Sequence, residues 1–200
     1  NKVNLSNRTS DHLLVQFGYD NWANKPDSIN TKGFSRFLNM YFMFDKLFKS
    51  NPHFSVAYGI GVGSSNVFFQ NTVIDIAGKI STSKINFQNA EKMNHYKKYK
   101  LVNAWAEIPL ELRYASNPEN LNKSWKLAIG GKIGTMLNAH TKGKTLVDSS
   151  GNVLNGQTKT IDKVNNKGFF NSTRIAATVR IGYGHFSIYG AYQINSLFKE

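Results

Sequence analysis

The sequence predicts an all-β protein that forms an antiparallel, up-and-down transmembrane β-barrel. Several segments alternate apolar and polar residues over stretches longer than the five or six residues usual in soluble strands. The polar face of these segments carries charges or glycines, and the connections between them are alternately short and long. This combination is typical of strands that cross an outer membrane, which need about 9–11 residues each.

The clearest strand is residues 102–114, with the sequence VNAWAEIPLELRY. Its even positions are all apolar or aromatic, whereas its three charges, Glu107, Glu111 and Arg113, all stand at odd positions. A period of two indicates a strand with two different faces. If the apolar face meets lipid, the charged face must fill the interior of a barrel. Pro109 cannot donate to a strand ladder, so we expect a β-bulge at this position.

Further segments with the same alternation are predicted as strands. In chain order they are residues 11–20, 33–45, 54–63, 124–138, 168–182 and 186–194. In residues 54–63, glycines occupy alternate positions, as small side chains do on the inner face of a narrow barrel. In a soluble sandwich, the same glycines would mark bulges or a tight corner.

The connections between these segments differ in length in a regular way. Residues 64–100 and 139–167 are long polar segments, whereas the turns at residues 46–52 and 183–185 are short. Outer-membrane barrels have short periplasmic turns and longer extracellular loops. A soluble sandwich or a lipocalin-like barrel has no reason to segregate its loops in this way.

The strand count is odd. Seven strands are visible in the sequence, whereas single-chain bacterial barrels normally have an even number. We expect eight strands in the complete wall, because an open edge in lipid leaves backbone groups unpaired at several kcal/mol each. The eighth is expected beyond residue 200 or outside this chain; residues 1–10 or a partner are the alternatives. Residues 1–200 are expected to form a single barrel domain.

Composition narrows the class of protein. The chain has no cysteine, which excludes disulfides and thiolate metal sites. Aromatic residues reach 13%, and no run approaches the 18 apolar residues of a transmembrane helix. The net charge of +13 implies anionic neighbours, such as lipopolysaccharide phosphates, nucleic acid or an acidic partner. Because no nucleic-acid-binding module is recognisable, nucleic acid is not expected as a partner.

Three stretches resemble a known family. They are AEIPLELRY preceded by Lys100 and Leu101, VQFGYDNW with the later GFSRFLNMYFMFD, and the closing IYGAYQINSLFKE. Together they resemble the small outer-membrane β-barrel proteins of Bacteroidota, often called porin-family or PorT-like. The resemblance covers most of the chain outside the two long polar segments. It implies an eight-stranded barrel in the outer membrane of a Gram-negative cell and transfers no catalytic residues.

Alternation directs six charged side chains toward the barrel interior. They are Glu107, Glu111, Arg113, Lys132, Arg174 and Arg180. Because side chains fill the interior of an eight-stranded barrel, buried charges there need partners. We expect a salt-bridged network that fixes the barrel, with a gated ion path or paired-carboxylate chemistry as alternatives. Glu107 and Glu111 are too far apart for a carboxylate dyad, at roughly 13 Å along one strand.

Lysines populate the two long polar segments. They are Lys92, Lys97, Lys98, Lys100, Lys142, Lys144, Lys159, Lys163 and Lys167. In a barrel both segments lie at the extracellular end, so they form basic extracellular loops. Such a collar is expected to bind lipopolysaccharide phosphates or an acidic partner, and a solvated polar surface is the equally weighted alternative.

No enzymatic activity is expected. The histidines lack the spacing of metal ligands, and no cofactor motif or catalytic triad is recognisable. The leading hypothesis is an integral outer-membrane barrel that serves as a structural or accessory subunit of a larger complex for secretion, assembly or uptake. Its expected partners are membrane lipid, lipopolysaccharide and other proteins of that complex. A small porin or transporter is the alternative, and a soluble lipocalin-like ligand binder is a further one.

Overall fold

The computed structural model describes residues 12–22, 25, 29, 31, 33–80, 85–154 and 160–199. Almost all of the regular structure in these residues is β-strand. The elements are β1 (Leu13–Tyr19), β2 (Arg36–Leu47), β3 (Phe54–Phe69), β4 (Thr72–Asp75), β5 (Asn86–Asn89), β6 (His95–Ala115), the 3₁₀ turn η1 (Leu121–Lys123), β7 (Trp125–Val147), β8 (Ile161–Asn165), β9 (Thr173–Tyr183) and β10 (Phe186–Gln193). No helix in this part of the chain has the length and apolar character needed to cross a membrane.

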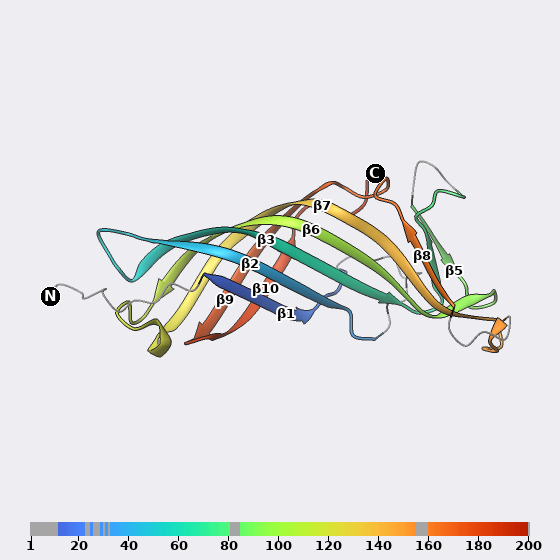
Figure 1. Cartoon of the computed structure of the whole chain (residues 1–200), viewed down its shortest axis with the longest axis horizontal. Helices are drawn as coiled ribbons and strands as arrows, with labels where there is room; N and C mark the ends of the chain where they lie inside the picture. Colours follow the sequence, from blue (N-terminus) through green and yellow to red (C-terminus); the bar gives the residue numbers. More distant parts are fainter. Residues whose placement is uncertain are drawn as a thin grey trace.

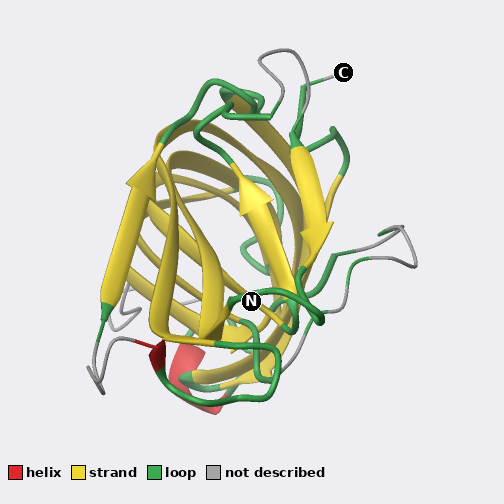
Figure 2. Cartoon of the chain, turned by 90° about the vertical axis from the view of Figure 1, so that its right-hand side faces the viewer, coloured by secondary structure: helices red, strands yellow, loops and turns green. Residues whose placement is uncertain are grey.

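The strands form one antiparallel up-and-down sheet. Its order is β1-β2-β3-β6-β7-β9-β10, with β8 paired to β7 beside this path, and β4 and β5 form a separate two-stranded sheet. Short turns gather at one end of the molecule and long connections at the other (Figure 1), and the sheet curls around a common axis (Figure 2). The predicted all-β, up-and-down architecture is therefore confirmed, and the strands of the main path are those predicted from the sequence.

β1 and β10 stand at the two ends of the strand order. Among the described residues, no strand pairing joins them. The proposal that residues 1–10 close the wall falls on residues outside the described ones. β1 and β10 therefore present their outer backbone groups without a strand partner in the described part of the chain.

The outer face of the sheet is apolar and the inner face is not. Along β3, Tyr58, Ile60 and Val62 are 50–62% exposed on the outside, and the glycines between them face inward. The register between β2 and β3 runs without a shift past these glycines, so they mark no bulge. A Cβ at Gly61 would clash with the carbonyl oxygen of Met40 on β2, so the strands approach closely only because this position is glycine. The predicted row of small inner residues is confirmed.

Three strands continue well into the polar segments predicted as loops. β3, β6 and β7 run past the predicted boundaries at residues 63, 102 and 138. This continuation, called the extension below, also includes β8 and the β4–β5 hairpin. Its inward side chains pack into the larger of two apolar clusters in the described chain. The buried members of this cluster are Ile29, Val67, Phe69, Ile74, Ile76, Tyr99, Leu101, Trp105, Met136, Ala139, Phe169 and Phe170. The prediction of two long loops is therefore wrong for much of their length.

The predicted bulge at Pro109 is wrong. β6 keeps one register with β3 on both sides of Pro109, although the pairing is interrupted there. Proline lacks one N–H donor, and the ladder tolerates the loss of one bond without an inserted residue. The irregularity lies instead between Ala104 and Trp105 of β6, where β7 carries the extra residue Leu137.

Contact of the outer face with lipid can be tested at the middle of β3. Ile60→Arg is expected to lower the free energy of unfolding by about 2–4 kcal/mol, the cost of arginine near a bilayer midplane. Urea unfolding in lipid vesicles, followed by tryptophan fluorescence, measures this change. Gln70→Arg, just beyond the end of the same strand, is the control and should change it by less than about 0.5 kcal/mol. Equal small effects would contradict lipid contact at Ile60.

Candidate functional site

The centre of the interior is organised around Glu107 of β6, which is 1% exposed. Lys132 of β7 donates to its Oε2 over 2.9 Å, and Arg174 of β9 donates to its Oε1 over 3.3 Å. The hydroxyl of Tyr41 on β2 also donates to Oε2. One carboxylate therefore ties together strands that lie on different sides of the interior. These bonds satisfy a charge that would be costly to bury alone.

Small residues make room for this carboxylate. A Cβ at Gly63 would lie 2.6 Å from Oε2 of Glu107, and a Cβ at Gly134 would lie 2.8 Å from its Cγ. These glycines come from β3 and β7, the two strands that pair with β6. The inner glycines are therefore part of the site, because larger residues would displace Glu107 from its partners.

A second carboxylate, Glu111, forms a separate tier toward the short-turn end. Arg113 Nε and Arg180 Nη2 donate to its Oε2 over 2.8 and 2.7 Å. Arg113 also approaches Asp45 of β2, with 3.9 Å between Nη1 and Oδ1. Together the two tiers contain all of the interior charges predicted from alternation. The structure adds Tyr41 and Asp45, which alternation along β2 also turns inward.

The interior is also bridged near the unpaired edges. Phe37 of β2 reaches Tyr189 of β10, with 5.9 Å between ring centroids. Gly18 of β1 permits this contact, since a Cβ there would lie 2.8 Å from the Phe37 ring. Aromatic packing in the interior therefore connects β2 to β10 across β1, where the described backbone shows no pairing.

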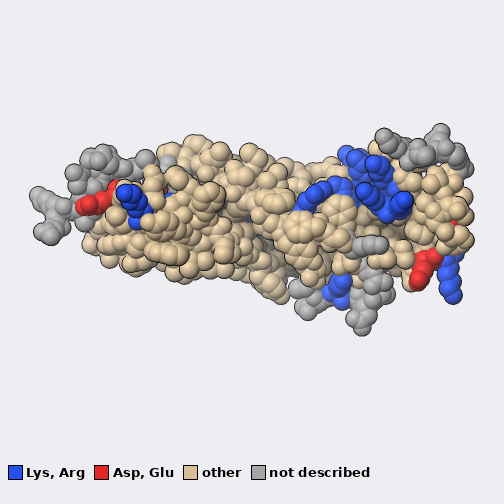
Figure 3. All heavy atoms as spheres, turned by 90° about the horizontal axis from the view of Figure 1, so that it is seen from below, with Lys and Arg blue, Asp and Glu red and all other residues tan. Residues whose placement is uncertain are grey.

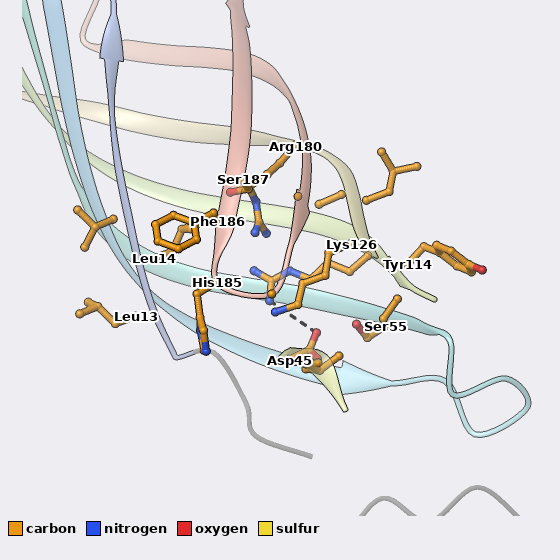
Figure 4. Close-up of a pocket in the computed structure, with 18 residues that line it drawn as sticks. Leu13, Leu14, Asp45, Ser55, Tyr114, Lys126, Arg180, His185, Phe186 and Ser187 are labelled. Carbon is orange, nitrogen blue, oxygen red and sulfur yellow. Dashed lines mark ion pairs between the residues drawn. The ribbon is translucent and has the colours of Figure 1, made fainter. Parts of the chain in front are cut away.

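A cavity of about 430 Å³ lies between the second tier and the short-turn end of the molecule. Figure 4 shows Asp45, Lys126 and Arg180 around it, with Leu13 and Phe186 from the two edge strands on one side. Its lining thus combines charged interior residues with apolar residues of the outer face. Within the described residues, no group of three His, Asp or Glu side chains is arranged to hold a metal ion.

The predicted basic residues lie mainly on strands. Lys97, Lys98 and Lys100 belong to β6, Lys142 and Lys144 to β7, and Lys163 to β8, whereas Lys92 and Lys167 lie in turns. Lys159 lies outside the described residues. Figure 3 shows Lys and Arg gathered toward the long-loop end of one face, beyond a middle region with few charges. The description of these lysines as loop residues is therefore corrected: most of them belong to the strands of the extension.

Polar contacts also hold the extension together. Tyr96 of β6 donates its hydroxyl to Asp162 of β8 over 2.7 Å. Burial and this hydrogen bond raise the pKa of Tyr96 to about 12. Because Asp162 accepts this bond from the inner side, it does not lie among the outward lysines.

Comparison with known proteins identifies the family. The family model described as outer membrane protein beta-barrel domain matches residues 4–199. The chain therefore belongs to this family, and it is an integral barrel protein of the outer membrane. No curated protein matches the chain, and no solved structure matches it.

The central tier consists of Glu107 with Lys132, Arg174 and Tyr41. Its contribution to the free energy of unfolding can be measured by removing Glu107. Glu107→Ala leaves Lys132 and Arg174 buried without their carboxylate, and should lower the free energy of unfolding by about 3–5 kcal/mol. The double variant Glu107→Ala/Lys132→Ala should lose less than the sum of the two single variants, by about 0.5–3 kcal/mol.

Urea unfolding in lipid vesicles gives these values. Glu91→Ala, at an exposed turn position, is the control and should change the free energy of unfolding by less than about 0.5 kcal/mol. Strict additivity of Glu107→Ala and Lys132→Ala would show that the two side chains do not stabilise each other.

Proposed function

We propose that this outer-membrane β-barrel protein is a structural or accessory subunit of a larger outer-membrane complex and has no enzymatic activity. The observation that carries the proposal is the filled interior around Glu107. Lys132, Arg174 and Tyr41 all bond to this carboxylate from other strands. Because the interior charges pair with one another, they make the barrel rigid, and a rigid barrel can serve as a surface to which other molecules bind.

The same network argues against the alternative of a small porin. Glu107 and Lys132 are 1% and 5% exposed, so water does not reach most of their surface. Passage of an ion between these side chains would require breaking charge-assisted bonds that are stronger than neutral ones. A resting pore at this level is therefore unfavourable.

Two features support protein partners. The extension projects beyond the apolar outer face and has its own buried core, which gives it a fixed shape. The edges of β1 and β10 carry backbone groups that a partner strand can pair with, because exposed sheet edges are templates for strand addition. Secretion, assembly and uptake machineries of the outer membrane are the classes of complex that we propose.

The finer relationship within the family is also part of the proposal. The stretches AEIPLELRY and SLFK support placing the chain among the PorT-like barrels of Bacteroidota. This placement is consistent with the accessory role, because the resemblance transfers no catalytic residues.

The accessory role predicts stable partners in the native membrane. We expect an affinity-tagged chain, extracted from outer membranes in mild detergent, to elute with other proteins in fixed stoichiometry. Size-exclusion chromatography with mass spectrometry of the peak provides the measurement, and untagged cells processed in parallel are the control. A monodisperse monomer without copurifying protein would contradict the accessory role.

The filled interior predicts an absence of conductance. The purified chain should give no single-channel steps in planar lipid bilayers. Tyr41→Ala/Glu107→Ala/Lys132→Ala, which removes the central tier, should produce steps if the variant still folds. Heat-dependent gel mobility checks the folding of both proteins. Regular steps from the unaltered chain would favour the porin alternative.

A further inference from the structure

Strand register brings three lysines of the extension side by side. Lys100 of β6 stands directly opposite Lys142 of β7, and Lys142 stands directly opposite Lys163 of β8. Directly opposed residues on neighbouring strands have Cβ atoms about 4.5–5.5 Å apart. The three residues, called the lysine row below, therefore form a continuous line of positive charge across three strands.

The lysine row faces outward. The neighbours of Lys100 in the chain, Tyr99 and Leu101, are both buried in the core of the extension. Lys142 likewise lies between the buried residues Thr141 and Gly143. Since successive side chains on a strand point to opposite faces, the lysines project away from that core.

The lysine row also lies at the border of the apolar outer face that is nearer the long-loop end. Along the outward face of β6, Val102 follows Lys100, and Ile108 and Leu110 continue the same face with 56% exposure each. On β2 the exposed Leu38 stands two residues after Arg36 in the same way. The basic side chains therefore begin where lipid-facing residues end, at the level of lipid headgroups.

More cations surround the row. Arg36 and Lys100 both lie 5.6 Å from the centroid of the Phe68 ring, so two cations share one aromatic platform. Lys98 and Lys144 form a second opposed pair one position further from the lipid-facing residues on the same face. Burial, and then the neighbouring charges of Lys142 and Arg36, lower the pKa of Lys100.

No carboxylate balances these charges within the described part of the chain. None of the ion pairs there involves a residue of the lysine row. Lys100 donates to the amide oxygen of Asn66, a neutral group, over 2.8 Å. The nearest acid in the register, Asp162, stands opposite Gly143 and bonds to Tyr96 from the inner side. Like charges placed directly opposite one another destabilise a sheet, so a bound anion would relieve the repulsion within the row.

We propose that the lysine row, Lys100, Lys142 and Lys163, with Arg36 beside it, binds the phosphate groups of an anionic glycolipid in the outer leaflet. A phosphate supplies oxygens that accept charge-assisted hydrogen bonds from several cations at once. A lipid is the occupant, rather than a soluble anion, because Lys100 and Arg36 each stand next to an outward apolar residue of their own strand, Val102 on β6 and Leu38 on β2. This inference needs only the outer-membrane location and is independent of the accessory role.

The test compares two triple variants of the full chain in detergent. Lys100→Gln/Lys142→Gln/Lys163→Gln removes the row, and Lys46→Gln/Lys49→Gln/Lys123→Gln removes the same charge from exposed positions at the short-turn end. The probe is diphosphorylated lipid A added to the micelles, with binding followed by native mass spectrometry. We expect the row variant to bind at least about tenfold more weakly than the unaltered chain, and the control variant to bind like it.

The source of the phosphate is tested in parallel. Dephosphorylated lipid A should bind the unaltered chain at least about tenfold more weakly than the diphosphorylated form. Inorganic phosphate at millimolar concentration should fail to displace the lipid. Equal losses in both triple variants, no preference for the phosphorylated lipid, or full displacement by inorganic phosphate would each overturn the proposal.

A stability measurement separates binding from structural damage. Without lipid, the row variant should melt at the same temperature as the unaltered chain or higher, because repulsion between like charges is removed. Added diphosphorylated lipid A should raise the melting temperature of the unaltered chain and of the control variant, but not that of the row variant. Loss of binding together with a lower melting temperature in lipid-free detergent would overturn the assignment of the row as a binding site.

Discussion

In hydrocarbon, every backbone N–H and C=O group needs a partner, and the rest of this structure depends on that constraint. Paired strands meet it, and their pairing sends side chains alternately to the lipid and to the interior. On β6 this alternation exposes Ile108 and Leu110 and buries Glu107 and Glu111. Buried carboxylates must then find cations, and Lys132 and the arginines of β6 and β9 supply them. The interior network is thus a consequence of how the wall is built.

Alternation is a local property of the chain, and it therefore predicted which residues face inward. All of the charged residues expected in the interior lie there, and Tyr41 follows the same rule on β2. Which side chains bond to one another depends on the register between strands. The sequence of a single strand does not reveal that register. Glu107 meets Arg174 of β9, with which its own strand does not pair, because both reach across the interior past β7. The distance between Glu107 and Arg174 depends on the curvature of the sheet and on the glycines that make room for the carboxylate.

The extension escaped prediction because its polar and apolar faces are exchanged. Below Leu137, the outward positions of β7 are apolar; above it, Lys142 faces out and Ala139 is buried. On β7 the extra residue at Leu137 shifts the alternation by one, which turns Lys142 and Lys144 outward. β6 has no extra residue, and its outward positions simply change from Val102 to Lys100. A period of two read straight through residues 124–138 cannot reveal this change. The lysines beyond it resemble a solvated loop unless the buried residues between them are recognised.

The exchange of faces separates the two kinds of charge in this protein. Below it, charges point inward and neutralise one another around Glu107 and Glu111. Above it, the lysines of β6, β7 and β8 that stand opposite one another point outward, and none of the described ion pairs involves them. The described interior ion pairs join four cations to three carboxylates, a net charge of +1, so they account for little of the +13 of the chain. The interior carboxylates are thus joined to cations of the same network, whereas the lysine row faces outward and the edges of β1 and β10 have no strand partner in the described chain.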